Sequence, residues 1–160
     1  MQADMLLKEI SAVFPAIAMP CAAASTVHQN DCERCDDVRR YFDIYKDSKI
    51  DDVFIRYMHQ NLYQLSPLGF LWLLPYYLKY CLAEEWRYTQ EQVYFLVYSL
   101  SPAPQFESNA YIQLSELNAA QIHCLMNFLS WCNETEDYYD SEEDTNKAFS
   151  FLKKLLSKQA

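Results

Sequence analysis

Glycine is almost absent from this chain, since Gly69 is the only one among 160 residues. Phosphate-binding loops, dinucleotide fingerprints and two-residue hairpin turns each need several glycines, because their backbones take up positive φ angles or approach a ligand closely. The composition therefore excludes P-loop and Rossmann enzymes. No other catalytic constellation is recognisable, so the sequence predicts a protein that is not an enzyme. A hydrolase built on scattered carboxylates is the third and last alternative.

Charges and long apolar runs are also scarce in the middle of the chain. Residues 53–133 contain five acids and three bases, which are too few for a wholly solvated surface. This half of the chain should therefore supply core or interface. The uncharged run over residues 61–78 contains two prolines, a serine and two amides. It predicts a buried helix rather than a membrane span.

Cysteine is present at six positions, but no secretory signal accompanies it. The apolar stretch over residues 12–24 follows two acids and is interrupted by Pro15 and Pro20, which is unlike a signal peptide. Three of the cysteines lie in apolar helical patterns, where small buried thiols are common. We expect a cytoplasmic protein with reduced thiols.

Apolar residues recur with helical periodicity nearly throughout. The pattern predicts an all-α fold, with residues 1–160 forming a single domain of about seven helices. The centre of the core is expected at Trp72, Leu74, Tyr77 and Leu78. Pro75 lacks a backbone donor and crowds the preceding turn, so the helix over residues 67–82 should be kinked or divided there.

Helix boundaries are indicated by capping residues. The predicted N-terminal signals are Asp51, Ser66 with Pro67, Thr89 with Gln92, Asn118 with Gln121 or alternatively Ser115, and Ser141 with Asp144. Residues 15–30 are expected to form a loop that leads to a helix beginning near Asp31. A short extended piece is expected over residues 111–114.

His28, Cys32 and Cys35 have the spacing H-x3-C-x2-C. At the start of a helix, this spacing would place three soft ligands within reach of one tetrahedral Zn²⁺. The fourth ligand would be Cys21, or a distant residue such as His123 or Cys124. The alternative is that Cys32 and Cys35 are half-buried thiols, which form a disulfide only if the backbone departs from a regular helix.

Two other histidines have simpler interpretations. His123 and Cys124 are adjacent, so on a helix they point about 100° apart and cannot act on each other. We interpret them as a polar-face histidine and a packed cysteine. His59 lies opposite the apolar stripe predicted for its helix and is expected to be solvated.

The strongest charge feature is an acidic run over residues 134–144, with seven carboxylates, two tyrosines and no base. The run accounts for seven of the nine net negative charges, so it disfavours nucleic acid and anionic lipid and favours a basic protein surface. Carboxylates around aromatic anchors suit such a partner. The predicted partner-binding residues are Glu134, Glu136, Asp137, Tyr138, Tyr139, Asp140, Glu142, Glu143 and Asp144. The alternative is a solvated linker whose acids complement a helix dipole.

Two segments carry a resemblance: His28-Gln-Asn-Asp-Cys-Glu-Arg-Cys35 and Leu65-Ser-Pro-Leu-Gly-Phe-Leu-Trp-Leu-Leu-Pro-Tyr-Tyr-Leu78. Together, over residues 6–82, they resemble a family of small bacterial proteins known only as a domain of unknown function. The resemblance implies a bacterial, helical, cytoplasmic protein and carries no activity. The leading hypothesis is an acidic protein-binding module, such as an immunity-type inhibitor of a basic toxin. The alternative is a small zinc-binding helical protein with a structural or regulatory metal.

Overall fold

The computed structural model describes residues 2–83, 90–135 and 142–159, and within them the fold is all-α. The elements in chain order are α1 (Ala3–Val13), α2 (Ala22–Ser25), α3 (Glu33–Tyr45), α4 (Asp52–Met58), the 3-10 helix η1 (His59–Gln64), α5 (Pro67–Cys81), α6 (Gln90–Leu100), the 3-10 helix η3 (Pro104–Phe106), α7 (Glu107–Gln113), α8 (Ala119–Glu134) and α9 (Glu142–Gln159). The predicted fold class is confirmed.

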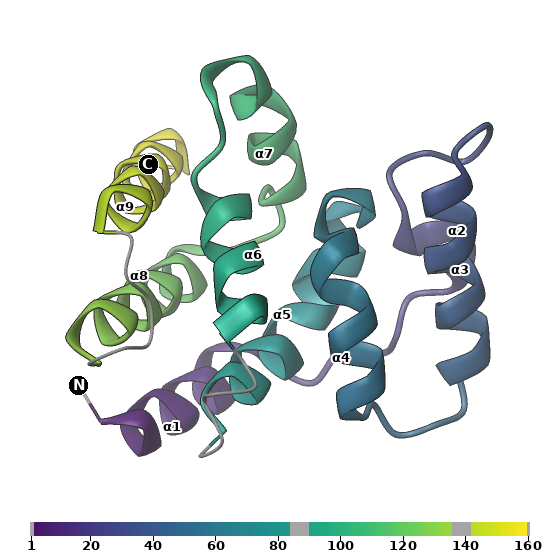
Figure 1. Cartoon of the computed structure of the whole chain (residues 1–160), viewed down its shortest axis with the longest axis horizontal. Helices are drawn as coiled ribbons and strands as arrows, with labels where there is room; N and C mark the ends of the chain where they lie inside the picture. Colours follow the sequence, from purple (N-terminus) through teal and green to yellow (C-terminus); the bar gives the residue numbers. More distant parts are fainter. Residues whose placement is uncertain (1, 84–89, 136–141, 160) are drawn as a thin grey trace.

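The helices form two groups that meet at α5 and where η1 packs on α6 (Figure 1). On one side, α1 packs along α8, α8 packs along α9, and α6 contacts α9. On the other side, α3 contacts both α2 and η1. α5 contacts members of both groups, including α1, α2, α4 and α6. This helix is therefore the shared support of the fold.

One hydrophobic cluster runs through the molecule, with members from α1, α3, α4, α5, α6, α8 and α9. The predicted centre in α5 is buried, with Trp72 3% exposed and Leu78 fully enclosed. Trp72 contacts the rings of Phe42 and Phe54, at centroid distances of 5.3 and 5.9 Å. The Tyr77 hydroxyl donates to the Gln92 carbonyl at 2.8 Å and so links α5 to α6. α5 has few charges to expose, which is why it lies inside the fold.

Three of the predicted caps are confirmed. The Asp51 carboxylate accepts from the Phe54 N–H at 3.0 Å, and the Ser66 hydroxyl accepts from the Gly69 N–H at 3.0 Å. Asn118 and Gln121 form a reciprocal capping box at the start of α8. Thr89 and Ser141, predicted to cap two further helices, lie outside the described residues.

Several local expectations need correction. Residues 111–113 belong to α7 instead of an extended piece, because Tyr111 packs on Phe151 and buried Gln113 donates to two carbonyls of the η1 end. The predicted loop over residues 15–30 contains the one-turn helix α2. The next helix begins at Glu33 with Cys32 as its N-cap, which confirms the predicted start near Asp31.

Pro75 lies inside α5, which continues unbroken from Pro67 to Cys81. Division of the helix at this proline does not occur, because packing on several helices outweighs the lost hydrogen bond. A kink at Pro75 within a continuous helix stays a prediction. Among the described residues, no helix combines the length and the apolar character needed to cross a membrane.

The single glycine lies where α2 crosses the start of α5, a contact we call the α2–α5 junction. A methyl group at residue 69 would lie 2.5 Å from the Ser25 carbonyl oxygen. The same carbonyl accepts from the Ser66 N–H at 2.9 Å, and the Ser66 hydroxyl donates to the Ala24 carbonyl at 2.6 Å. Val27 N–H then donates to the Gln64 carbonyl at 2.9 Å. Glycine is required at position 69 because backbone meets backbone.

We predict that Gly69→Ala lowers the free energy of unfolding by about 1–3 kcal/mol, because the new methyl group must displace backbone. At an unconstrained helix position the same change stabilises by about 1 kcal/mol, so the sign of the effect is diagnostic. Chemical denaturation is the measurement. Leu68→Ala, at a position 43% exposed in the same helix, is the control and should change stability much less. A stabilised Gly69→Ala protein would contradict the close approach at the junction.

Candidate metal centre

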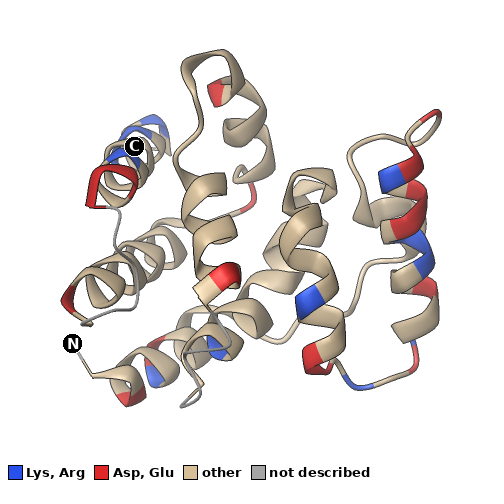
Figure 2. Cartoon of the chain, in the orientation of Figure 1, with Lys and Arg blue, Asp and Glu red and all other residues tan. Residues whose placement is uncertain are grey.

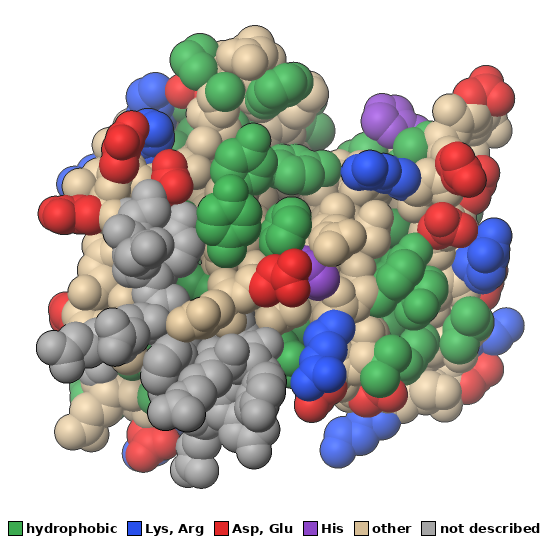
Figure 3. Space-filling model, in the orientation of Figure 1, with side chains coloured by type: hydrophobic (Ala, Val, Ile, Leu, Met, Phe, Trp, Pro, Cys, Tyr) green, Lys and Arg blue, Asp and Glu red, His purple; other side chains and the backbone are tan. Residues whose placement is uncertain are grey.

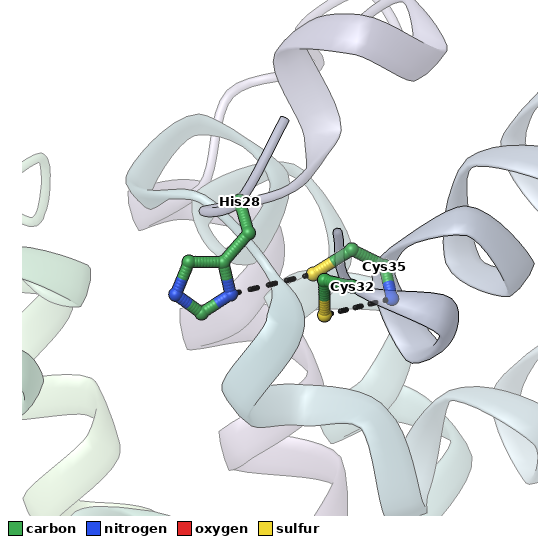
Figure 4. Close-up of side chains that lie close together, drawn as sticks. All are labelled: His28, Cys32 and Cys35. Carbon is green, nitrogen blue, oxygen red and sulfur yellow. Dashed lines mark hydrogen bonds between the residues drawn. The ribbon is translucent and has the colours of Figure 1, made fainter. Parts of the chain in front are cut away.

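His28, Cys32 and Cys35 come together at the start of α3 (Figure 4). Their potential ligand atoms, one ring nitrogen and two sulfurs, all lie within 4.8 Å of one another. His28 Nδ1 and Cys35 Sγ are 3.7 Å apart. His28 is exposed, Cys32 is half-buried and Cys35 is fully buried. The group is therefore accessible to solvent from the His28 side.

Cys32 occupies the N-cap position of α3, with extended backbone angles of φ −133° and ψ 97°. Its sulfur accepts from the Cys35 N–H at 3.4 Å, the role that an oxygen of Ser or Asp usually has at a helix start. Asp31 just before it has a φ of 57°, in the left-handed region that aspartate tolerates better than most residues. This turn lets the chain double back, so that residues 28 and 35 meet.

The environments of the two thiols are opposite. Hydrogen bonds from the Cys35 thiol and backbone N–H lower the pKa of Cys32, and His28 contributes in the same direction. Burial raises the pKa of Cys35. Although it is fully enclosed, Cys35 is not a member of the main hydrophobic cluster. Its burial therefore belongs to this local group and not to the central core.

The other buried thiols contrast with Cys32. Cys81, Cys124 and Cys132 are members of the main hydrophobic cluster. Burial raises the pKa of all three thiols, that of Cys124 to about 12. Thiols of this kind are packing groups with little reactivity. The expectation that Cys124 is a packed cysteine and His123 an exposed one is confirmed.

Arg39 holds the segment that carries His28 against α3. Its Nη1 donates to Thr26 Oγ1 and to the His28 carbonyl, each at 2.6 Å. Its Nη2 donates to the Gln29 carbonyl at 3.4 Å and pairs with Asp36. A planar guanidinium holds its five N–H donors in a fixed fork, so it can satisfy several acceptors in set directions at once. Arg39 is therefore a positioning residue for the group.

The fourth ligand expected from sequence is not found among the described residues. The group within ligand distance comprises His28, Cys32 and Cys35, and it does not include Cys21, His123 or Cys124. Cys21 is exposed at the N-cap of α2. His123 and Cys124 lie on α8, in the other group of helices (Figure 1). A metal bound here would keep one position open to solvent.

The expectation that His59 is solvated is wrong. His59 is 8% exposed, its ring lies 4.9 Å from that of Phe95, and its Nδ1 donates to the Arg56 carbonyl. Its Nε2 lies 3.5 Å from a Glu91 carboxylate oxygen. The reason is tertiary packing, since η1 lies against α6 and brings the His59 ring next to Phe95 and Glu91. The residue pattern of one helix does not show which second helix will cover its polar face.

The predicted acidic surface is described only in part. Glu136, Asp137, Tyr138, Tyr139 and Asp140 lie outside the described residues. Glu134, Glu142 and Glu143 are exposed, and Asp144 is half-buried. In the first turn of α9, Lys147 Nζ lies 2.7 Å from a Glu143 oxygen and 3.8 Å from an Asp144 oxygen. Figure 2 shows these acids at the start of α9 and its basic residues towards the end, an order that complements the helix dipole.

Sequence reasoning missed an exposed aromatic cluster. Tyr63, Tyr94 and Tyr98 are 45–51% exposed. Tyr94 and Tyr98 stack one turn apart on α6, and Tyr63 of η1 meets Tyr98 edge-on at 6.2 Å. Apolar side chains reach the surface over α6 and, separately, between α3 and α4 (Figure 3). The i, i+4 tyrosines were visible in the sequence, but their neighbour on η1 was not.

We predict that Arg39→Ala loosens the His28 segment, because three backbone or side-chain acceptors lose a charged donor. Amide hydrogen exchange over residues 26–30 should accelerate, and stability should fall by about 1–3 kcal/mol. Arg40→Ala is the matched control, since the Arg40 side chain is 70% exposed against 16% for Arg39 and its pair with Asp37 lies at the surface. Equal effects of the two substitutions would contradict the role assigned to Arg39.

Comparison with known proteins adds a family but no activity. Residues 22–155 match the model of the Family of unknown function (DUF6714). No curated protein and no solved structure matches the chain. The match extends well beyond residue 82, where the resemblance noted in the sequence ends, and it includes both the metal-ligand group and the α2–α5 junction. The chain therefore belongs to the Family of unknown function (DUF6714).

Proposed function

We propose that this protein is a small zinc-binding helical protein, with a structural or regulatory metal held by His28, Cys32 and Cys35. The proposal is carried by one observation: the three potential ligand atoms lie within 4.8 Å of one another. They come from a loop, a helix cap and the first turn of α3. Such convergence of soft ligands is unusual for residues that only pack.

The types of ligand favour zinc. Two thiolates and an imidazole suit Zn²⁺, whereas Mg²⁺ and Ca²⁺ prefer oxygen ligands. Zinc bonds of about 2.0–2.3 Å place tetrahedral ligand atoms about 3.3–3.8 Å apart, so the group needs an inward shift of about 1 Å. His28 is exposed and Cys32 lies outside the regular helix, so both side chains have room to make that shift.

Bound zinc would join the His28 segment to the first turn of α3, which Arg39 already braces from the side. Three protein ligands leave a fourth position for water or for a ligand from another molecule. The ligands must be thiolates and neutral imidazole, so zinc binding requires reduced cysteines. The affinity for zinc should fall at acid pH, because protons compete for the ligand atoms. A bacterial cytoplasm, which the resemblance in the sequence implied, keeps thiols in that state.

We predict that protein purified without chelator contains about one equivalent of zinc, because a group of three converging ligands binds the metal during folding. Removing the zinc with a chelator should lower the melting temperature, and adding it back should restore the original value. The Cys32→Ser, Cys35→Ser double variant should contain no zinc and should show no melting shift on zinc addition. Elemental analysis and thermal denaturation are the measurements.

Cys21→Ser is the matched control, because Cys21 is an exposed cysteine outside the group. It should retain the zinc content and melting shift of the unmodified protein. Metal-free protein whose melting temperature does not respond to zinc would refute the zinc proposal. Loss of zinc from the Cys21 variant would instead add Cys21 to the ligand set.

A second candidate function is the acidic protein-binding module, of the kind an immunity protein provides against a basic toxin. What supports it is the exposure of Glu134, Glu142 and Glu143 at the facing ends of α8 and α9. Carboxylates gathered in this way attract a basic surface over several ångströms. The charge pairs of Lys147 favour the competing interpretation, in which the acids serve α9 itself.

We predict that neutralising four acids of the run slows association with a basic protein that copurifies with the chain, and flattens its dependence on salt. The substitutions are Glu136→Gln, Asp137→Asn, Asp140→Asn and Glu143→Gln. Stability should change little, since the described member of the four, Glu143, is exposed and its pair with Lys147 lies at the surface. The measurement is binding kinetics at two ionic strengths.

The control replaces four acids elsewhere on the chain, all of them exposed. Its substitutions are Asp4→Asn, Asp43→Asn, Asp47→Asn and Glu116→Gln. Equal on-rates for the two variants would mean that net charge alone matters, and the run would lose its role as a docking surface.

A further inference from the structure

The two sulfurs of the metal group have a geometry that a pair of cysteines on a regular helix lacks. Residues three apart on a helix have Cβ atoms about 5–6 Å apart, whereas a disulfide needs about 3.5–4.5 Å. Cys32 is outside the regular helix, with extended angles at the N-cap. Its sulfur turns back over the first turn of α3, to 3.4 Å from the Cys35 nitrogen. The backbone therefore departs from a helix at the position where a bridge requires it.

The two cysteines differ in how far they are exposed to solvent. Cys32 is half-buried beside the exposed His28, and Cys35 lies beneath it, fully buried. A reagent from solvent therefore meets the Cys32 sulfur first and leaves Cys35 as the internal partner. The other described cysteines lack this access. Cys21 is exposed and outside the group, whereas Cys81 and Cys132, which are close enough to interact, and Cys124 are all buried in the main core. A C-x2-C pair at a helix start is an arrangement suited to thiol–disulfide exchange.

We propose that Cys32 and Cys35 form a reversible intramolecular disulfide when the chain meets a low-molecular-weight disulfide, and that closing this bridge releases the bound zinc. The release of metal rests on the zinc function proposed above. The disulfide itself does not, because it needs only the two sulfurs. The site thereby becomes a metal centre that responds to the thiol–disulfide balance of its surroundings.

The thiol–disulfide exchange takes place in two steps. The Cys32 thiolate attacks one sulfur of the small disulfide, forming a mixed disulfide and expelling one small thiolate. The Cys35 thiolate then attacks the Cys32 sulfur, forming the internal bridge and expelling the second small thiolate. Two electrons pass from the two cysteine sulfurs to the small disulfide, and any proton that leaves a cysteine thiol is taken up by an expelled small thiolate. With both sulfurs in the bridge, His28 alone of the three proposed ligands would remain to hold zinc.

The test uses the full chain loaded with zinc and equilibrated in glutathione buffers of increasing oxidised fraction. A chromogenic chelator measures released zinc, and peptide mapping identifies the cysteines that are bridged. We expect one Cys32–Cys35 disulfide for each zinc released, and recovery of zinc binding after reduction. Cys35→Ser should stop at a mixed disulfide between Cys32 and glutathione, because the second step has no attacking sulfur.

Cys21→Ser is again the control and should behave as the unmodified chain. If the protein binds no zinc but still forms the Cys32–Cys35 disulfide reversibly, the exchange stands and the zinc function fails. If zinc remains bound while glutathione modifies only Cys21, the exchange is overturned and the zinc function stands. Bridges between other cysteine pairs, or glutathione on Cys35 before Cys32, would also overturn it.

Discussion

The α2–α5 junction is the constraint on which the rest of the candidate site depends. The Ser25 carbonyl accepts from the Ser66 N–H at 2.9 Å and leaves no room for a side chain at residue 69. Ser66 therefore serves two elements, since it caps α5 and fixes the end of α2. The segment over residues 24–27 has little apolar area of its own to bury. Backbone hydrogen bonds to the start of α5 and the end of η1 hold it instead.

A short series of contacts connects this junction to the metal-ligand group, which consists of His28, Cys32 and Cys35. Thr26 forms an isolated bridge with Leu65 and accepts from Arg39 of α3. Arg39 also holds the His28 carbonyl, so the loop is fixed between α5 on one side and α3 on the other. No single contact here is strong, but together they limit the positions open to the His28 side chain. Hydrogen bonds that orient the residues carrying the ligands affect how tightly a site can bind its metal.

The remainder of the molecule is a conventional helical core around α5, with charges placed at its margins. α5 through α8 carry few charged residues, whereas α3 and α9 carry many (Figure 2). The metal-ligand group lies at one edge of this core, and Cys35 is buried outside the main cluster. A local change there, such as loss of metal or closure of a disulfide, can therefore occur without repacking the core.

The sequence by itself determined the features whose causes are local. Capping by Asp51, Ser66 and Asn118 depends on residues within one turn, and helical periodicity depends on neighbours three and four apart, so these expectations held. It also identified Cys32 and Cys35, whose proximity follows from their spacing. Tertiary structure decided the rest: the packing of α6 on η1 that buries His59, the helical state of residues 111–113, and the hydrogen bonds from Arg39 to the His28 segment. Each of these depends on a hydrogen bond or packing contact between segments far apart in the chain, and the local residue pattern does not contain that information.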